Sequence, residues 1–325
     1  MIKKLAATLL CLAALVTLPA CGSGNGTGSA SASANSAASA SAPEEQKLKV
    51  SVTFDAMKEL VEAVGKDKVE ISTIIPAGTE PHDFEPKAQD LVNLSTATVF
   101  VYNGLGMEGW AEEAISSANN PALVVVEASK DADVIERETA DEDHHDEETE
   151  EDHDHGKYDP HLWLGLKGAQ TEVKNIADAL VQADPDNTAF YQQNCDEFIA
   201  QLEELYNEYS DKFQSVEKKN FVTGHAAFGY LCRDFGLEQN SIQDLFAEGE
   251  PSAQQLAELV EYCKEHEVTT IFAEEMVSTA ISQTLANEVG AKVEVIYTME
   301  NAQDGLTYLE RMESNLAKIY DSVAA

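Results

Sequence analysis

Basic residues are scarce in this chain. Lys and Arg together number 21 against 59 Asp and Glu, which gives a formal net charge of −38 over 325 residues. A protein that binds nucleic acid gathers Lys and Arg on one face to neutralise phosphate groups. The shortage of positive charge therefore argues against nucleic acid as a partner. The length allows two ordinary domains, each with its own core.

Cysteine is also infrequent, with five residues in all. Cys11 and Cys21 lie near the start, and Cys195, Cys232 and Cys263 lack the close Cys-x-x-Cys pairing of a thiolate zinc site. A disulfide between Cys232 and Cys263 is compatible with an oxidising compartment, but nothing in the spacing requires it. We expect these last three cysteines to be partly buried, unreactive thiols.

Two motifs of common enzymes are missing from the sequence. The chain has no Gly-rich phosphate-binding loop, so any use of ATP would need a separate ATP-binding partner. It also has no His-Glu-x-x-His segment, the helical motif of many zinc peptidases. The sequence thus argues against an enzyme.

Long apolar runs are missing after the N-terminal segment. Lys3-Lys4 precedes an apolar run, residues 5–18, that is too short to span a bilayer, and a small residue and Cys21 follow. This pattern predicts a secretory signal peptide over residues 1–21. The region around Cys21 is similar to the bacterial lipobox, which implies cleavage before Cys21 and lipidation of its thiol. The alternative is an ordinary signal peptide with a cysteine there by chance.

Residues 22–45 form a stretch composed mostly of Gly, Ala and Ser. This composition predicts a flexible linker. With the lipid on Cys21, such a linker would hold a domain outside the cytoplasm, anchored to the bacterial cell membrane.

The most unusual feature that is present is an acidic, histidine-rich tract between Asp141 and His161, which carries five of the eight histidines. Dense imidazole and carboxylate groups suit zinc better than magnesium, calcium or manganese. His161 lies at the edge of the tract, where apolar sequence resumes. We predict an accessory metal-binding loop over residues 130–156, with the candidate residues His144, His145, His153 and His155.

The role of this loop has several alternative interpretations. It could concentrate zinc, pass ions to His161 or sense zinc abundance. It could also be a solvated loop that binds metal without consequence.

Strand-like and helix-like segments alternate along the rest of the chain. The strand patterns lie at residues 47–54, 69–75, 98–102, 122–127, 220–223, 269–273 and 292–297. The helix patterns lie at residues 56–64, 87–97, 109–118, 224–235, 251–266, 279–289 and 306–320. This order predicts an α/β fold with two lobes, 46–184 and 218–325, each with a mostly parallel sheet flanked by helices.

One long rigid helix is expected between the lobes, over residues 185–217. Its apolar side chains recur at helical spacing on one face, at Tyr191, Cys195, Phe198, Leu202, Leu205 and Tyr209. Two shorter consecutive helices are the alternative.

Four residues stand at the loop or strand ends where such sheets present ligand groups: His82, His161, His225 and Glu300. Three imidazoles and a carboxylate would complete a tetrahedral zinc shell. For the fourth position, Glu274, Glu275 and a water molecule remain alternatives to Glu300.

The segments around these residues resemble the zinc- and manganese-binding lipoproteins that serve bacterial ABC transporters. The resemblance rests on the lipobox, the acidic histidine tract and the segments Pro81–Pro86, Asp159–Trp163, Gly224–Tyr230 and Glu300–Thr307. It implies that the N-terminal lobe supplies His82 and His161, that the C-terminal lobe supplies the other two ligands, and that the ion lies between the lobes. It also implies a membrane permease and its ATP-binding subunit as partners, with a monomeric receptor.

Zinc is the expected metal, because manganese-binding members of this family tend to have a carboxylate where this chain has His225. The sequence therefore predicts a high-affinity Zn²⁺ receptor for an ABC importer. The alternatives are a manganese receptor of the same family, a zinc-dependent hydrolase, and a surface adhesin held together by zinc.

Overall fold

The computed structural model describes residues 47–137, 157–245, 247, 251–274, 279–301 and 305–325. The predicted signal peptide, lipidated Cys21 and linker lie outside these residues. So do His144, His145, His153 and His155 of the acidic loop, and Glu275.

The first sheet is parallel and has the strand order β2-β1-β3-β4. Its strands are β1 Leu48–Val52, β2 Val69–Thr73, β3 Val99–Tyr102 and β4 Val124–Glu127. The central strands β1 and β3 are rich in valine, and the last three residues of β1 and the first three of β3 are buried, as expected for strands covered on both faces. In register, Val50 lies between Ile71 and Val99.

The second sheet repeats this arrangement with the order β6-β5-β7-β8, again parallel throughout. Its strands are β5 Asn220–Thr223, β6 Glu238–Ser241, β7 Thr270–Glu274 and β8 Lys292–Ile296. In both sheets the central pair is formed by the first and third strands, so that ligand groups after β5 and β7 come from neighbouring strand ends.

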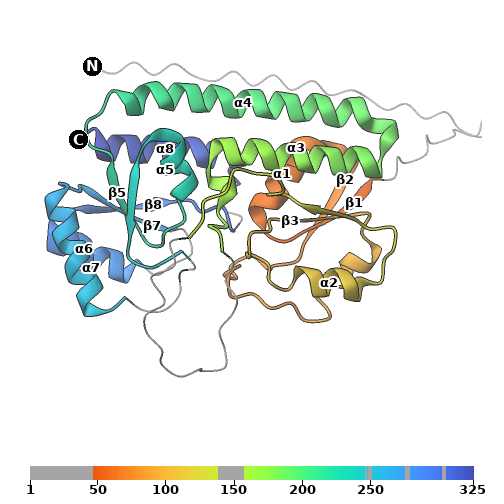
Figure 1. Cartoon of the computed structure of the whole chain (residues 1–325), viewed down its shortest axis with the longest axis horizontal. Helices are drawn as coiled ribbons and strands as arrows, with labels where there is room; N and C mark the ends of the chain where they lie inside the picture. Colours follow the sequence, from red (N-terminus) through yellow and green to blue (C-terminus); the bar gives the residue numbers. More distant parts are fainter. Residues whose placement is uncertain (1–46, 138–156, 246, 248–250, 275–278, 302–304) are drawn as a thin grey trace, which may run out of the picture. The chain divides into compact units, whose positions relative to one another are not determined.

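Eight α-helices accompany the two sheets within the described residues. They are α1 Asp55–Gly65, α2 Ala111–Ala118, α3 Leu166–Ala183, α4 Thr188–Gln214, α5 Gly229–Phe235, α6 Ala253–Glu265, α7 Ala280–Val289 and α8 Tyr308–Val323. Figure 1 shows them around the strands that they connect. The predicted fold class, two parallel sheets flanked by helices with one long helix between them, is confirmed. None of the described helices is long and apolar enough to cross a membrane.

Helix α4 has 27 residues, about 40 Å at 1.5 Å per residue. It begins at Thr188 because Pro185–Asn187 forms a separate short 3₁₀ turn. Five of the six residues of its predicted apolar face are buried, and Leu205 is half-buried. Helix α4 packs against α1 and α3 near the first sheet and against α5 and α8 near the second (Figure 1). It therefore braces both halves of the fold.

Three local predictions were wrong or incomplete. Residues 87–97 form turns and a 3₁₀ segment, Asn93–Thr96, in place of the expected helix. The hydroxyls of Ser95 and Thr96 donate to the backbone carbonyls of Val92 and Asn93, and such local bonds compete with helix formation. Helix α3 and strand β6 were not predicted at all.

The three described cysteines, Cys195, Cys232 and Cys263, are buried and free. Burial raises the pKa of each thiol, so that thiolate is suppressed and reactivity is low. The expectation of unreactive thiols is supported, although the side chains are more deeply buried than predicted. No disulfide joins Cys232 and Cys263.

Candidate metal site

Four side chains from distant parts of the sequence converge at one point: His82, His161, His225 and Glu300. His82 follows β2, His161 immediately precedes a 3₁₀ turn, His225 follows β5 and Glu300 follows β8. Each offers one ligand atom, and these atoms all lie within 4.8 Å of one another. The structure thus brings together all four residues that were singled out from the sequence.

The distances within this cluster suit a small divalent cation. The Nε2 atom of His161 lies 3.1 Å from Nε2 of His82 and 3.4 Å from Nε2 of His225. Two nitrogen ligands of a tetrahedral zinc ion are expected to be about 3.3 Å apart, given Zn–N bonds of about 2.0–2.1 Å. The Oε1 atom of Glu300 lies 3.8 Å from Nε2 of both His82 and His161, so a small inward movement would complete the shell.

All four ligand side chains are withdrawn from solvent, with exposed side-chain fractions of 5 % or less. Three imidazoles and one carboxylate packed this closely bring many lone pairs into one small space. Burial of such groups is costly unless a cation or proton compensates them.

His161 is held by Asp159, two residues before it. One carboxylate oxygen of Asp159, Oδ1, accepts hydrogen bonds from the backbone N–H and from Nδ1 of His161, each at 2.9 Å. This contact fixes the proton on Nδ1 and leaves the Nε2 lone pair facing the cluster. Burial, and then the charge of His225, lower the pKa of His161 well below its ordinary value. His161 is therefore neutral at pH 7, the form that binds metal.

His225 is oriented in a similar way by Glu274, at the end of β7. Oε1 of Glu274 accepts a hydrogen bond of 2.9 Å from the backbone N–H of His225 and lies 3.5 Å from Nδ1 of its ring. A Cβ atom on Gly224 would lie only 1.8 Å from Oε2 of Glu274. Glycine is thus required at 224 for this carboxylate to reach its place.

The charge state of His225 differs from that of His161. Burial by itself lowers the pKa of His225, but the carboxylates of Glu274, Glu300 and Glu80 outweigh burial and raise the pKa to about 9. An incoming cation must therefore displace a proton from His225 at pH 7. Glu274 lies on the Nδ1 side of this ring, while Glu300 is the carboxylate that joins the four-residue cluster.

The side chain of Glu300 is hydrogen-bonded to Thr298, which in turn is hydrogen-bonded to Trp163 in the first half of the fold. Its Oε2 atom accepts a hydrogen bond of 2.9 Å from the Thr298 hydroxyl, and the Thr298 carbonyl accepts one of 2.7 Å from the indole N–H of Trp163. Trp163 is fully buried and lies two residues after His161. The cluster residues His161 and Glu300 are therefore linked through these two hydrogen bonds and short stretches of backbone.

Sequence reasoning did not identify two further residues, Arg311 and Tyr230, as supports of the site. Arg311, on α8, forms a buried ion pair of 2.8 Å with Asp55 at the start of α1 and donates to the carbonyls of Asn301 and Leu306, which flank the segment after Glu300. Tyr230, on α5, donates to the carbonyl of Asp159. The Arg311–Asp55 and Tyr230–Asp159 contacts join residues far apart in sequence, so no local pattern indicates them.

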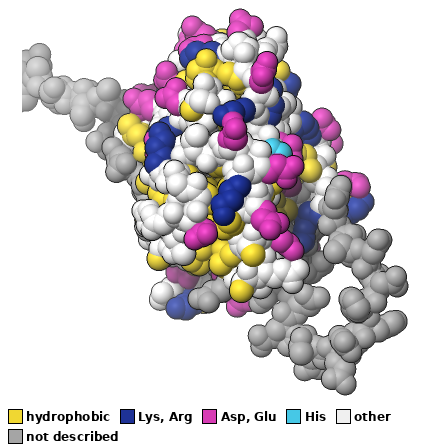
Figure 2. Space-filling view, turned by 90° about the vertical axis from the view of Figure 1, so that its left-hand side faces the viewer, with side chains coloured by type: hydrophobic (Ala, Val, Ile, Leu, Met, Phe, Trp, Pro, Cys, Tyr) yellow, Lys and Arg dark blue, Asp and Glu magenta, His cyan; other side chains and the backbone are white. Residues whose placement is uncertain are grey.

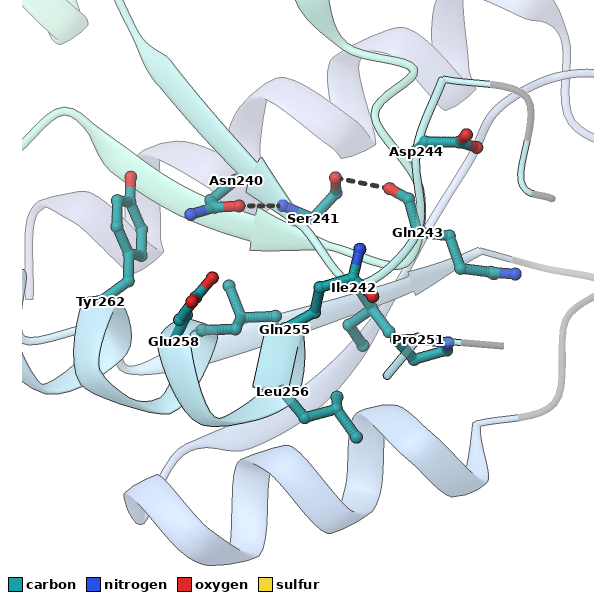
Figure 3. A pocket seen from close by; sticks show the side chains of 11 residues that line it. Asn240, Ser241, Ile242, Gln243, Asp244, Pro251, Gln255, Leu256, Glu258 and Tyr262 are labelled. Carbon is teal, nitrogen blue, oxygen red and sulfur yellow. Dashed lines mark hydrogen bonds between the residues drawn. The ribbon is translucent and has the colours of Figure 1, made fainter. Parts of the chain in front are cut away.

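A separate surface pocket of about 490 Å³ lies between β6 and α6. Figure 3 shows its lining, in which the Ser241 hydroxyl donates to the Gln243 carbonyl, while Glu258 and Tyr262 come from α6. None of the four cluster residues lines this pocket.

The charge on one face of the molecule is mixed in sign. On the face shown in Figure 2, Lys and Arg side chains stand among Asp and Glu side chains and do not form one continuous basic area.

Comparisons with known proteins give a consistent result. Residues 50–322 match the family "Zinc-uptake complex component A periplasmic". The high-affinity zinc uptake system protein ZnuA of Bacillus subtilis is 41% identical over 279 residues, which cover 84% of this chain and 87% of that protein.

Solved structures agree with the sequence comparisons. A mutant of the laminin-binding adhesin Lmb from Streptococcus agalactiae has a TM-score of 0.76 at 33% identity, covering 85% of this chain and 99% of that chain. A zinc-bound ZnuA deletion mutant has a TM-score of 0.74 at 29% identity, covering 86% and 99%. The chain therefore belongs to the family of periplasmic component A proteins of zinc-uptake complexes.

Proposed function

We propose that this protein captures Zn²⁺ outside the cytoplasm and delivers it to an ABC importer, composed of a permease and an ATP-binding subunit. The observation that carries this proposal is the buried cluster of three imidazoles and one carboxylate at distances suited to zinc. The zinc-uptake family and its zinc-binding relatives support it.

In this proposal His82, His161 and His225 bind zinc through Nε2, and Glu300 binds through Oε1. The presence of three nitrogen ligands favours zinc over manganese, which prefers oxygen. A shell filled by four protein ligands also favours binding over hydrolysis, because a catalytic zinc site keeps a position open for water. We therefore propose a receptor and not an enzyme.

The remaining sequence predictions complete this picture. Residues 1–21 would be a signal peptide, Cys21 would carry the lipid anchor and 22–45 would be the linker. Residues 46–184 and 218–325 would be the two metal-binding lobes of a monomer, joined by 185–217.

The histidines of the acidic loop, His144, His145, His153 and His155, would be accessory metal ligands. Deletion of residues 139–156 should then reduce zinc uptake by cells when zinc is limiting. Unchanged uptake would leave the loop without a transport role.

Competitive titration of the mature domain with Zn²⁺ and Mn²⁺ tests the central proposal. Zinc should displace manganese, and alanine in place of each of His82, His161, His225 and Glu300 should weaken zinc binding. A preference for manganese, or a His225→Ala variant with the parent's zinc affinity, would contradict the assignment. The half-buried His266, whose ring packs against Tyr262 and not in the cluster, serves as a control, since its replacement should leave zinc binding unchanged.

A further inference from the structure

We propose that Tyr230 is a positioning residue for the metal ligand His161, and that its hydroxyl couples the second half of the fold to the zinc site. This inference rests on the proposed zinc-binding function and extends it. Tyr230 does not contact the ion in this proposal, since it acts through the backbone of Asp159.

The phenol of Tyr230 is completely buried and makes two hydrogen bonds. Its hydroxyl donates to the carbonyl of Asp159 at 2.6 Å and accepts from the backbone N–H of Ile135 at 3.2 Å. Asp159 and Ile135 are themselves joined, because the N–H of Asp159 donates to the carbonyl of Ile135 at 2.9 Å. One hydroxyl therefore fastens two antiparallel chain segments together.

Asp159 is the residue that orients His161. Its Oδ1 atom accepts from both the backbone N–H and Nδ1 of His161, each at 2.9 Å. A displacement of the Asp159 backbone would therefore move the carboxylate and turn the imidazole. Coordinate bonds are short and directional, so a small rotation of the His161 ring would lower zinc affinity.

Two glycines permit this close contact. A Cβ atom on Gly229 would lie 2.6 Å from Oδ2 of Asp159, and one on Gly165 would lie 2.7 Å from Cβ of Tyr230. Nearby, Arg233 of the same helix donates to the Asp133 carbonyl at 2.8 Å. Helix α5 therefore packs directly against the segments that flank His161.

This contact joins the two halves of the fold. Helix α5 follows β5 of the second sheet, whereas Asp159 belongs to the connection between β4 and α3 of the first. Any motion that draws α5 away from this connection breaks the Tyr230–Asp159 hydrogen bond and frees His161 to turn.

The test is the isosteric variant Tyr230→Phe, measured for zinc affinity by chelator competition and for metal-free stability by thermal unfolding. Tyr230→Phe removes both hydrogen bonds of the hydroxyl, and loss of the one to Asp159, which holds the support of His161, predicts a zinc Kd about 3- to 10-fold higher. Tyr191→Phe is the matched control. The Tyr191 ring is equally buried, and its hydroxyl donates one 2.8 Å bond, to Asp184 at the junction of α3 and α4. That variant should lose stability without a change in zinc Kd.

A second comparison separates positioning from general weakening. In a His161→Ala background, Tyr230→Phe should leave zinc Kd unchanged, because the ligand on which it acts is gone. An equal loss of affinity in both backgrounds, or no loss in either, would overturn the inference. If the unaltered protein did not bind zinc through His161 at all, the proposed function would fail instead, and the two failures are thereby distinguished.

Discussion

Replacement of Glu172 by Gln should make the protein more stable, and increasingly so as pH rises. Glu172 lies on α3, its side chain has no exposed surface, and neither carboxyl oxygen has a hydrogen-bond partner within the described part of the chain. Burial, and then the charge of Glu108, raise the pKa of Glu172 from 4.5 to about 8. The group is therefore protonated in the folded protein at pH 7 but ionised in the unfolded chain.

The sign of the effect follows from this difference. The unfolded chain releases its proton near the ordinary pKa of 4.5, while the folded protein retains it up to about 8. The contribution of Glu172 to the free energy of unfolding is thus lost progressively as pH rises through this window, by about 1.4 kcal/mol per pH unit. Between about pH 5.5 and about pH 8 the loss sums to about 3 kcal/mol, an upper bound because the surroundings can relax.

Urea denaturation of the metal-free protein across this pH range measures the effect. Gln has the same shape as the protonated acid and does not ionise, so the gap between Glu172→Gln and the unaltered protein should widen with pH. The exposed Glu261 on α6 provides a matched control, and Glu261→Gln should show no widening. Parallel stability curves for the unaltered protein and Glu172→Gln would refute the reasoning.

Three further outcomes are expected. Gly224→Ala should weaken zinc binding at least 10-fold, because its Cβ would displace the Glu274 carboxylate that orients His225. Gly109→Ala is the control and should bind zinc normally, because a Cβ at this position meets no atom within 4 Å. Competition titrations of the two variants measure this difference. Zinc affinity should fall by about 10-fold per pH unit from about pH 8 to about pH 6, because His225, with its pKa raised to about 9, must lose a proton to bind zinc. An affinity that does not change with pH would contradict this. Removal of zinc by a chelator should leave the circular dichroism of the protein essentially unchanged, because its continuous apolar core does not depend on the ion; unfolding on chelation would instead favour a domain held together by zinc.

The ligand cluster could be predicted from sequence because each ligand follows a recognisable strand or lies in a short, distinctive segment. His225 and Glu300, for example, come after β5 and β8, and parallel strands place their carboxyl ends along one edge of a sheet. The fold class was predictable for the same reason, since valine-rich strands alternate with amphipathic helices.

Other features were not accessible from local pattern. Strand β6 reads Glu-Gln-Asn-Ser and has no apolar residue, so only its parallel pairing with β5 makes it a strand. Helix α3 is an exception, because it carries a helical apolar repeat that includes Val173, Ile176 and Leu180 and is sufficient to indicate a helix. The Tyr230–Asp159 contact spans 71 residues of sequence, and nothing near either residue indicates it.

Helix α4 has a consequence for how tightly one ion can be held. In the proposed site each half of the fold contributes two ligands, and two ligands alone would make a weak site. Since α4 packs against both halves, the second pair meets an ion bound by the first at a high effective concentration, with little entropy left to lose. Affinity then depends on the stiffness of this brace as well as on the four side chains. A small movement of the two ligand pairs apart, much shorter than the length of α4, would then be enough to release zinc.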